Sequence, residues 1–139
     1  MTLDIQASDI SEGVINSARK AVYSSYALRN VPDLYLRKYF TNSNQSHSLN
    51  QTIKSMVKFS NMNLLDEKKM KLMRNTDVIF CRNVFIYFDD KAKQKVVSFL
   101  YDSLRTGGYL FIGTSESLHN VTRAFRPIFM NKTLVYQKV

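Results

Sequence analysis

The sequence predicts an α/β protein with a mostly parallel sheet that ends in an antiparallel hairpin. Apolar segments of strand length alternate with helical segments along the chain, an order typical of parallel strands joined by helices. The segment 77–81 enters a continuous apolar run, as in a strand buried on both faces. Two short runs within 128–139 are separated by Asn131-Lys132, which predicts the closing hairpin.

The composition fits one globular domain covering residues 1–139. Of its 139 residues, 45% are apolar and 12% aromatic, enough for a single core. The one cysteine, Cys81, excludes an intrachain disulfide and suits a reducing compartment. No apolar stretch has the ~20 residues of a membrane span, and the first residues carry no basic segment typical of a signal peptide. We therefore expect a cytoplasmic protein without membrane insertion.

The net charge of +9 needs a separate interpretation. Twenty basic residues against eleven acidic ones are compatible with an acidic partner or with nucleic acid. The basic residues are dispersed, however, and only 68–71 approaches a cluster. Most of this charge is therefore interpreted as solvated surface, and nucleic acid is not an expected partner.

In the first half of the chain, the pattern predicts a strand over 3–10 and a helix that Ser11 caps. Val14, Ile15, Ala18 and Val22 have helical spacing in that helix. A second helix is expected over 34–40. The segment 41–50 is rich in Ser, Thr and Asn, which indicates a polar loop or an exposed hairpin. Alternating residues over 53–59 then predict another strand.

In the second half, a short turn or helix is expected over 66–74, before the apolar strand at 77–81. Asp89-Asp90 would cap a helix over 91–104, which Arg105-Thr106-Gly107-Gly108 would stop. The apolar run 109–112 predicts a further buried strand.

Polar residues follow three of the predicted strands, where parallel sheets bind their ligands. Asp9 ends the first strand, Asn63 follows the second, and Arg82-Asn83 follow the third. Asp9 could accept ribose hydroxyls, or could simply help to cap the next helix. Asn83 could bind a ligand or cap a turn, and Tyr87 could be an ordinary core aromatic. These alternatives stay open at this point.

Other catalytic chemistries lack support. His47 and His119 have no partners at metal-ligand spacing, so no metal site is predicted. Gly107-Gly108 lacks the spacing of a phosphate-binding loop. Ser115 and Ser117 have no histidine at a spacing that would make either of them a nucleophile.

Several ordered blocks resemble one enzyme family. The most specific is Phe80-Cys81-Arg82-Asn83-Val84-Phe85-Ile86-Tyr87-Phe88-Asp89, and the others are Asp9-Ile10-Ser11, 56–59, 63–66, 107–113 and Ser115-Glu116-Ser117. Together they resemble the CheR-type chemotaxis receptor glutamate methyltransferases, over the C-terminal part of the S-adenosylmethionine-dependent catalytic domain. The resemblance implies a Rossmann-like class I methyltransferase sheet.

The resemblance also implies a reaction, a partner and a set of site residues. Such enzymes transfer a methyl group from S-adenosylmethionine to glutamates in the cytoplasmic domain of methyl-accepting chemoreceptors, giving methyl esters and S-adenosylhomocysteine. By this resemblance, Asp9 would hold the ribose, and Asn63 and Leu64 would lie on the adenine side. Arg82 and Asn83 would bind the cofactor near its reacting end, and Tyr87 would be the catalytic residue beside the transferred methyl.

The chain also departs from the family pattern. It starts at what would be the second strand, so the glycine-containing first strand and loop are not expected in it, and the strand ending at Asp9 and the strand before Asn83 would flank a gap. Thr114 replaces the usual histidine before Ser-Glu-Ser. The segment 41–52 corresponds to the family's small receptor-docking β-subdomain, or to a polar loop insertion, and contains no glycine.

Three functions therefore compete. The leading one is receptor glutamate methylation as part of a longer chain. The alternative is a truncated, non-catalytic module that binds a receptor or another partner. A nucleic-acid methyltransferase is disfavoured because Val84-Phe85 replace the proline-aromatic pair that base-modifying enzymes use, and no basic-aromatic groove is evident. No oligomeric state follows from the sequence.

Overall fold

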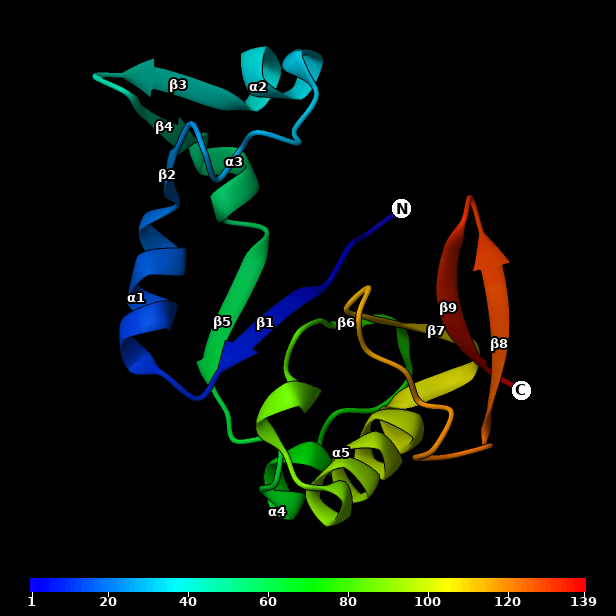
Figure 1. Cartoon of the computed structure of the whole chain (residues 1–139). Coiled ribbons are helices and arrows are strands. Elements are labelled where there is room, and N and C mark those ends of the chain that lie inside the picture. The colour runs from blue at the N-terminus through cyan, green and yellow to red at the C-terminus, as the bar shows by residue number, and fades with distance from the viewer. The chain divides into compact units, whose positions relative to one another are not determined.

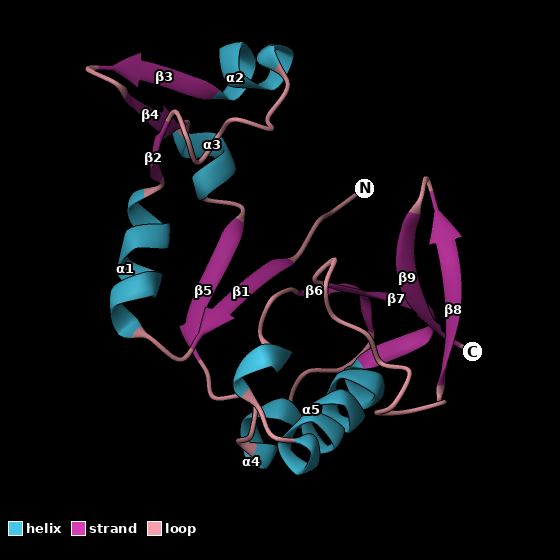
Figure 2. Cartoon of the chain, viewed as in Figure 1, coloured by secondary structure: helices cyan, strands magenta, loops and turns pink.

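The computed structural model describes all residues, Met1–Val139, as two compact units, Met1–Asn63 and Leu64–Val139 (Figure 1). Each unit combines helices with a parallel pair of strands, and each also contains antiparallel strands (Figure 2). The α/β class is therefore confirmed. The strands form three separate sheets, however, and only the four-stranded sheet combines a parallel pair with the antiparallel hairpin. None of the helices has the length and apolar character needed to cross a membrane.

The first unit contains a two-stranded parallel sheet covered by one helix (Figure 1). β1 (Ile5–Asp9) pairs with β5 (Val57–Asn61), and Asp9 lies opposite Asn61. α1 (Glu12–Lys20) packs on both strands and buries Ile15. As expected, Ser11 caps α1: its hydroxyl accepts a hydrogen bond from the Val14 amide at 3.3 Å.

α1 is shorter than predicted. Ala21 adopts a left-handed conformation (φ 51°) and its amide donates to the Ser17 carbonyl at 3.2 Å, which ends the helix. Val22, expected on the helix, instead begins β2 (Val22–Ser24). The αL cap therefore overrides the apolar spacing that had included Val22.

A second, antiparallel sheet of the first unit has the order β2-β4-β3. α2 (Asp33–Tyr39) leads into β3 (Phe40–Ser43), and a two-residue turn connects β3 to β4 (Ser46–Leu49). Asn44 and Gln45 in that turn both have positive φ, as tight hairpins with this twist require. The expected helix over 34–40 and the polar hairpin are both present.

The strand predicted over 53–59 begins later. Asn50 caps a short helix, α3 (Gln51–Lys54), by accepting a hydrogen bond from the Ile53 amide at 2.9 Å. β5 then begins at Val57 and extends to Asn61, whose side-chain amide donates to the Ile10 carbonyl at 2.8 Å. A local cap thus outweighs the alternating pattern at Ile53 and Lys54.

The second unit contains a four-stranded sheet in the order β6-β7-β9-β8. β6 (Thr76–Cys81) is parallel to β7 (Leu104–Ile112), whereas β9 (Thr133–Lys138) is antiparallel to β7 and to β8 (Phe125–Met130). α4 (Glu67–Met70), a 3₁₀ turn η1 (Phe85–Tyr87) and α5 (Asp90–Ser103) complete the unit. The predicted C-terminal hairpin is confirmed, with Asn131 and Lys132 at its turn.

α5 supplies one side of the core of this unit. Asp89 caps it by accepting a hydrogen bond from the Ala92 amide at 2.8 Å, as the sequence suggested. The helix ends at Ser103, and the Lys138 ammonium donates to the carbonyls of Tyr101 and Leu104, each at 2.8 Å. The buried residues here are Val96, Val97, Leu100, Leu104, Leu110 and Val135.

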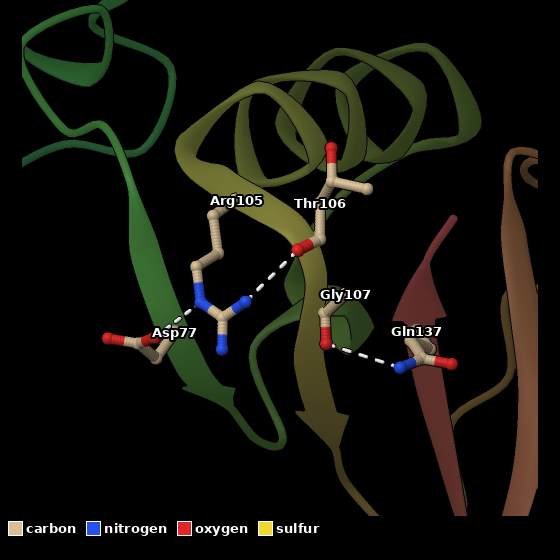
Figure 3. Close-up of polar contacts among 5 residues, drawn as sticks. All are labelled: Asp77, Arg105, Thr106, Gly107 and Gln137. Carbon is tan, nitrogen blue, oxygen red and sulfur yellow. Dashed lines mark hydrogen bonds and ion pairs between the residues drawn. The ribbon is translucent and has the colours of Figure 1, made fainter.

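The glycine pair is not the helix stop that the sequence suggested, because Gly107 and Gly108 lie inside β7. They lie beside the shift in register between Thr76 and Val78. Figure 3 shows the polar contacts around Gly107. There Arg105 forms an ion pair with Asp77, and the Gln137 amide donates to the Gly107 carbonyl at 3.2 Å. These contacts join β6, β7 and β9, and at Gly108 the backbones approach so closely that no room remains for a side chain.

The prediction that β6 is buried on both faces is wrong for this chain. Cys81 is buried, but Phe80 is 71% exposed and stacks on Phe111 with ring centroids 4.8 Å apart. β6 pairs with a strand on one edge only, and the same is true of β1 in the other unit. β6 therefore leaves one parallel edge unpaired in the second unit, and in the two-stranded sheet of the first unit both β1 and β5 have an unpaired edge.

Candidate functional site

In the first unit, the predicted site residues follow the carboxyl ends of the two parallel strands. Asp9 is the last residue of β1, and Asn63 follows β5 by two positions. Asp9 Oδ1 accepts a hydrogen bond from the Ser11 amide at 2.8 Å, so the capping interpretation of Asp9 has support. Only one of its two oxygens is used, however, and Oδ2 has no partner within the chain. A ligand hydroxyl can therefore still bind this carboxylate.

In the second unit, Arg82 and Asn83 follow the carboxyl end of β6. Asn83 adopts a left-handed conformation with φ 59°, which is uncommon outside glycine and most tolerated by Asn and Asp. Both side chains are exposed and make no hydrogen bond or ion pair within the chain. The turn thus presents a guanidinium and an amide that are free to bind a ligand.

Tyr87 is not a core aromatic. It closes η1, its side chain is 81% exposed, and its hydroxyl has no partner within the chain. Phe85, at the start of the same turn, is buried and anchors it. The local fold therefore brings Arg82, Asn83 and Tyr87 together on one short segment with their polar groups available.

One residue that orders this segment received no role from the sequence. The Glu116 carboxylate accepts hydrogen bonds from the amides of Asn83, Phe85 and Gly113, at 2.9, 2.9 and 2.8 Å. Glu116 follows β7, so its side chain joins the ends of two adjacent parallel strands. The sequence signal that could have indicated this role is an acidic residue three positions after Gly113, the glycine that follows the strand.

Cys81, directly before the Arg82-Asn83 turn, is a buried thiol. Burial raises its pKa to about 11, and the negative charge of Glu116 adds to this effect. A protonated, buried thiol is a poor nucleophile, which agrees with the inert role expected from the sequence.

The Cys81 thiol predicts a loss of stability at high pH. Below pH 9 the thiol is protonated in both states, and its contribution is fully present. Between pH 9 and 11 the unfolded thiol loses its proton while the folded one keeps it, so unfolding becomes easier. With a tenfold difference in proton affinity equal to about 1.4 kcal/mol, we expect a loss on the order of 2 kcal/mol by pH 11.

Urea unfolding of the wild type and of Cys81→Ala at pH 8 to 11 measures this loss. Lysines and tyrosines titrate in both proteins, so only the difference between the two curves reports the thiol. If that difference were constant over the whole range, the buried-thiol explanation would be wrong.

A shallow cavity lies in each unit, away from these residues. The first, of about 320 Å³, lies against the small sheet and is lined by Asp33, Leu36, Arg37, Phe40, Asn42 and His47. His47 Nε2 lies 3.1 Å from the Ser25 hydroxyl. The second, of about 440 Å³, lies beside the β8–β9 hairpin and includes His119 and Arg123. Neither cavity contains any of the residues predicted to bind the cofactor.

Comparison with known proteins agrees with the resemblance seen in the sequence. Residues 1–134 match the model of the family described as CheR methyltransferase, SAM binding domain, SAM being S-adenosylmethionine. Chemotaxis protein methyltransferase 2 of Vibrio cholerae is 35% identical over 137 residues, which are 98% of this chain and 48% of that protein. The chemotaxis protein methyltransferase of Vibrio parahaemolyticus is 36% identical, over 98% of this chain and 50% of its own length.

The relative from Salmonella typhimurium, also a chemotaxis protein methyltransferase, is 35% identical over 86% of this chain and 42% of its own length. Among solved structures, a SAM-dependent methyltransferase from Methanosarcina mazei is similar over 96% of this chain and 61% of that one. Its TM-score is 0.44 and its identity 14%, a likeness too distant to bear on function.

The chain spans about half the length of the curated relatives it matches. The family match itself covers nearly the whole chain, and the cofactor of the matched domain is S-adenosylmethionine. On these grounds the chain belongs to the CheR methyltransferase family.

Proposed function

We propose that this chain contributes cofactor-binding and substrate-facing parts of an enzyme that methylates glutamate carboxylates of chemoreceptors, with S-adenosylmethionine as the donor. The observation that carries this proposal is the segment after β6, where Arg82, Asn83 and Tyr87 present unpaired polar groups on an ordered turn. Family membership supplies the donor and the general reaction class.

Within this proposal, each site residue has a defined role. Asp9 accepts ribose hydroxyls through Oδ2, and Asn63 and Leu64 bind the adenine side. Arg82 and Asn83 bind the cofactor near its reacting end. The Tyr87 hydroxyl orients the substrate carboxylate. The free Oδ2 of Asp9 and the exposed Tyr87 hydroxyl are compatible with these roles.

The chemistry asks little of the protein beyond positioning. When bound, S-adenosylmethionine supplies a methyl group on a cationic sulfur. A glutamate carboxylate is already a nucleophile at neutral pH, so its oxygen can attack the methyl in line and no general base is required. The residues above would then act by holding two reactants in register and by excluding water.

Two further roles follow for the architecture. The β2-β4-β3 sheet would be a small β-subdomain that docks on receptors. Part of the segment 41–52 lies in this sheet. β1 and β6 each have an unpaired parallel edge, which would accept a further strand in the family fold. The unpaired edges of β6 and of both strands in the β1–β5 pair support this second role.

Cofactor binding is the direct test. We expect S-adenosylhomocysteine to give a heat of binding with the 139-residue chain in calorimetric titration. Asp9→Ala should weaken the affinity about tenfold, because a charged hydrogen bond to the ribose is lost. Glu12→Ala, also an acid near the start of α1, is the control and should bind as the wild type does.

Transfer activity needs a second measurement. The chain would be fused to the upstream half of the Vibrio cholerae relative and given labelled S-adenosylmethionine with receptor-containing membranes. Base-labile label on the receptor is the expected result. Label on added DNA instead would overturn the proposed substrate.

A non-catalytic receptor-binding module is the second candidate. The separate small sheet, with its cavity lined by Asp33, Arg37 and His47, favours it. Binding to receptor-containing membranes without any affinity for S-adenosylhomocysteine would identify this function in place of the first.

A further inference from the structure

Glu116 concentrates three hydrogen bonds on one carboxylate at the end of the β6–β7 pair. Its Oε2 accepts from the amides of Asn83 and Gly113, and its Oε1 accepts from the amide of Phe85. Charged acceptors of this kind make stronger hydrogen bonds than neutral ones. Both carboxylate oxygens therefore accept hydrogen bonds from backbone amides, and Glu116 itself is not placed to react.

The three amides belong to segments far apart in the sequence. Asn83 and Phe85 flank Val84 in the turn after β6, whereas Gly113 directly follows β7. The Glu116 amide in turn donates to the Gly113 carbonyl at 3.0 Å, which closes a tight turn around the side chain. The carboxylate thus fixes the turn after β6 relative to the end of the neighbouring strand.

The shape at Gly113 shows how closely these groups fit. A Cβ atom on Gly113 would lie 2.2 Å from Asn83 Oδ1 and 2.8 Å from Glu116 Oε2. Because Gly113 has no side chain, the Asn83 side-chain amide and the Glu116 carboxylate can both lie directly against it. Asn83 is held there in its left-handed conformation, which an unsupported turn would populate less.

We propose that Glu116 is a positioning residue for methyl transfer: its carboxylate sets the Arg82-Asn83 turn and the start of η1, so that Asn83 and Tyr87 face the donor and the acceptor. The proposal rests on the function proposed above, in which the turn binds S-adenosylmethionine. Glutamine would not substitute for Glu116, because its NH₂ group would meet backbone N–H donors. Aspartate keeps the charge and the acceptors but is one methylene shorter.

The test uses the 139-residue chain and the variants Glu116→Gln and Glu116→Asp. The control is Glu67→Gln, which removes an exposed ion pair with Lys71 in the same unit. Affinity for S-adenosylhomocysteine is measured by calorimetry. We expect Glu116→Gln to weaken it about tenfold or more, Glu116→Asp to fall between, and Glu67→Gln to have no effect.

Amide hydrogen exchange, followed by NMR without ligand, separates positioning from general stability. We expect faster exchange in Glu116→Gln at Asn83, Phe85 and Gly113, with the ladder amides of β6 and β7 unchanged. Faster exchange throughout both strands would mean a purely structural role and would overturn the proposal.

The binding results distinguish the positioning role of Glu116 from the proposed binding of S-adenosylmethionine. If the wild type binds and Glu116→Gln binds equally well, the positioning role is wrong while the proposed function stands. If the wild type does not bind S-adenosylhomocysteine, the cofactor site itself is refuted and the positioning role with it.

Discussion

Leu110→Ala is expected to lower the free energy of unfolding by about 2–5 kcal/mol, the range for a buried leucine that leaves a cavity. Leu110 lies in β7, its exposed fraction is 0%, and buried residues of α5 surround the same core. Domains are commonly stable by only about 5–15 kcal/mol, so this one change could leave the unit largely unfolded. Urea unfolding followed by far-UV circular dichroism measures it.

Leu72→Ala is the matched control, because Leu72 is 83% exposed in the same unit. The same atoms are removed there without opening a cavity, and we expect a change within about 0.5 kcal/mol. Equal effects at the two positions would show that β7 and α5 do not form the core described here.

Gly108→Ala is expected to destabilise the protein by about 1–3 kcal/mol through overpacking. A Cβ atom there would lie 2.9 Å from the Arg105 carbonyl oxygen, 3.0 Å from that of Asp77 and 3.0 Å from Leu104 Cδ2. Two of these atoms belong to backbone in paired strands, so they cannot turn away as a side chain can. A thermal unfolding midpoint several degrees below that of the wild type is the expected reading.

Gly13→Ala provides a contrast of opposite sign. Gly13 lies in α1, and the nearest atom to a new Cβ is Ser11 Oγ at an ordinary 3.7 Å. Alanine favours a helix over glycine by up to about 1 kcal/mol, so this change should stabilise the protein slightly. If both changes destabilised it alike, close packing at Gly108 would not be the cause.

The sequence predicted best the elements whose signals are local. Ser11 and Asp89 cap their helices, and Asn131-Lys132 form their hairpin turn, because each requires only neighbouring residues. Ile53 shows the limit: its alternating neighbours indicated a strand, yet the cap at Asn50 made a helical turn. When two local signals compete, periodicity alone does not decide between them.

The longer-range errors have a different origin. Gly107-Gly108 were interpreted as a helix stop because they follow a helix, but both lie inside β7. Gly107 has a positive φ of 83°, and Gly108 packs closely against the backbone of Asp77 in β6. Phe80 was expected to be buried because its segment is apolar, yet burial depends on which elements cover each face.

The site residues likewise divide into those predicted from local sequence signals and those that depend on long-range contacts. The strand-end positions of Asp9 and Asn83 followed from the order of the elements. The role of Glu116 did not, since three amides converge on it only after β6 and β7 have paired.

The unpaired edge of β6 has a consequence for handling the protein in solution. It offers a row of free backbone groups next to the exposed Phe80, which is the arrangement that promotes edge-to-edge aggregation. Native proteins often protect such edges with charge, and a lysine in place of Phe80 would apply that protection here. The natural sequence keeps an aromatic residue at this edge, so concentrated samples of the isolated chain should precipitate sooner than those of Phe80→Lys.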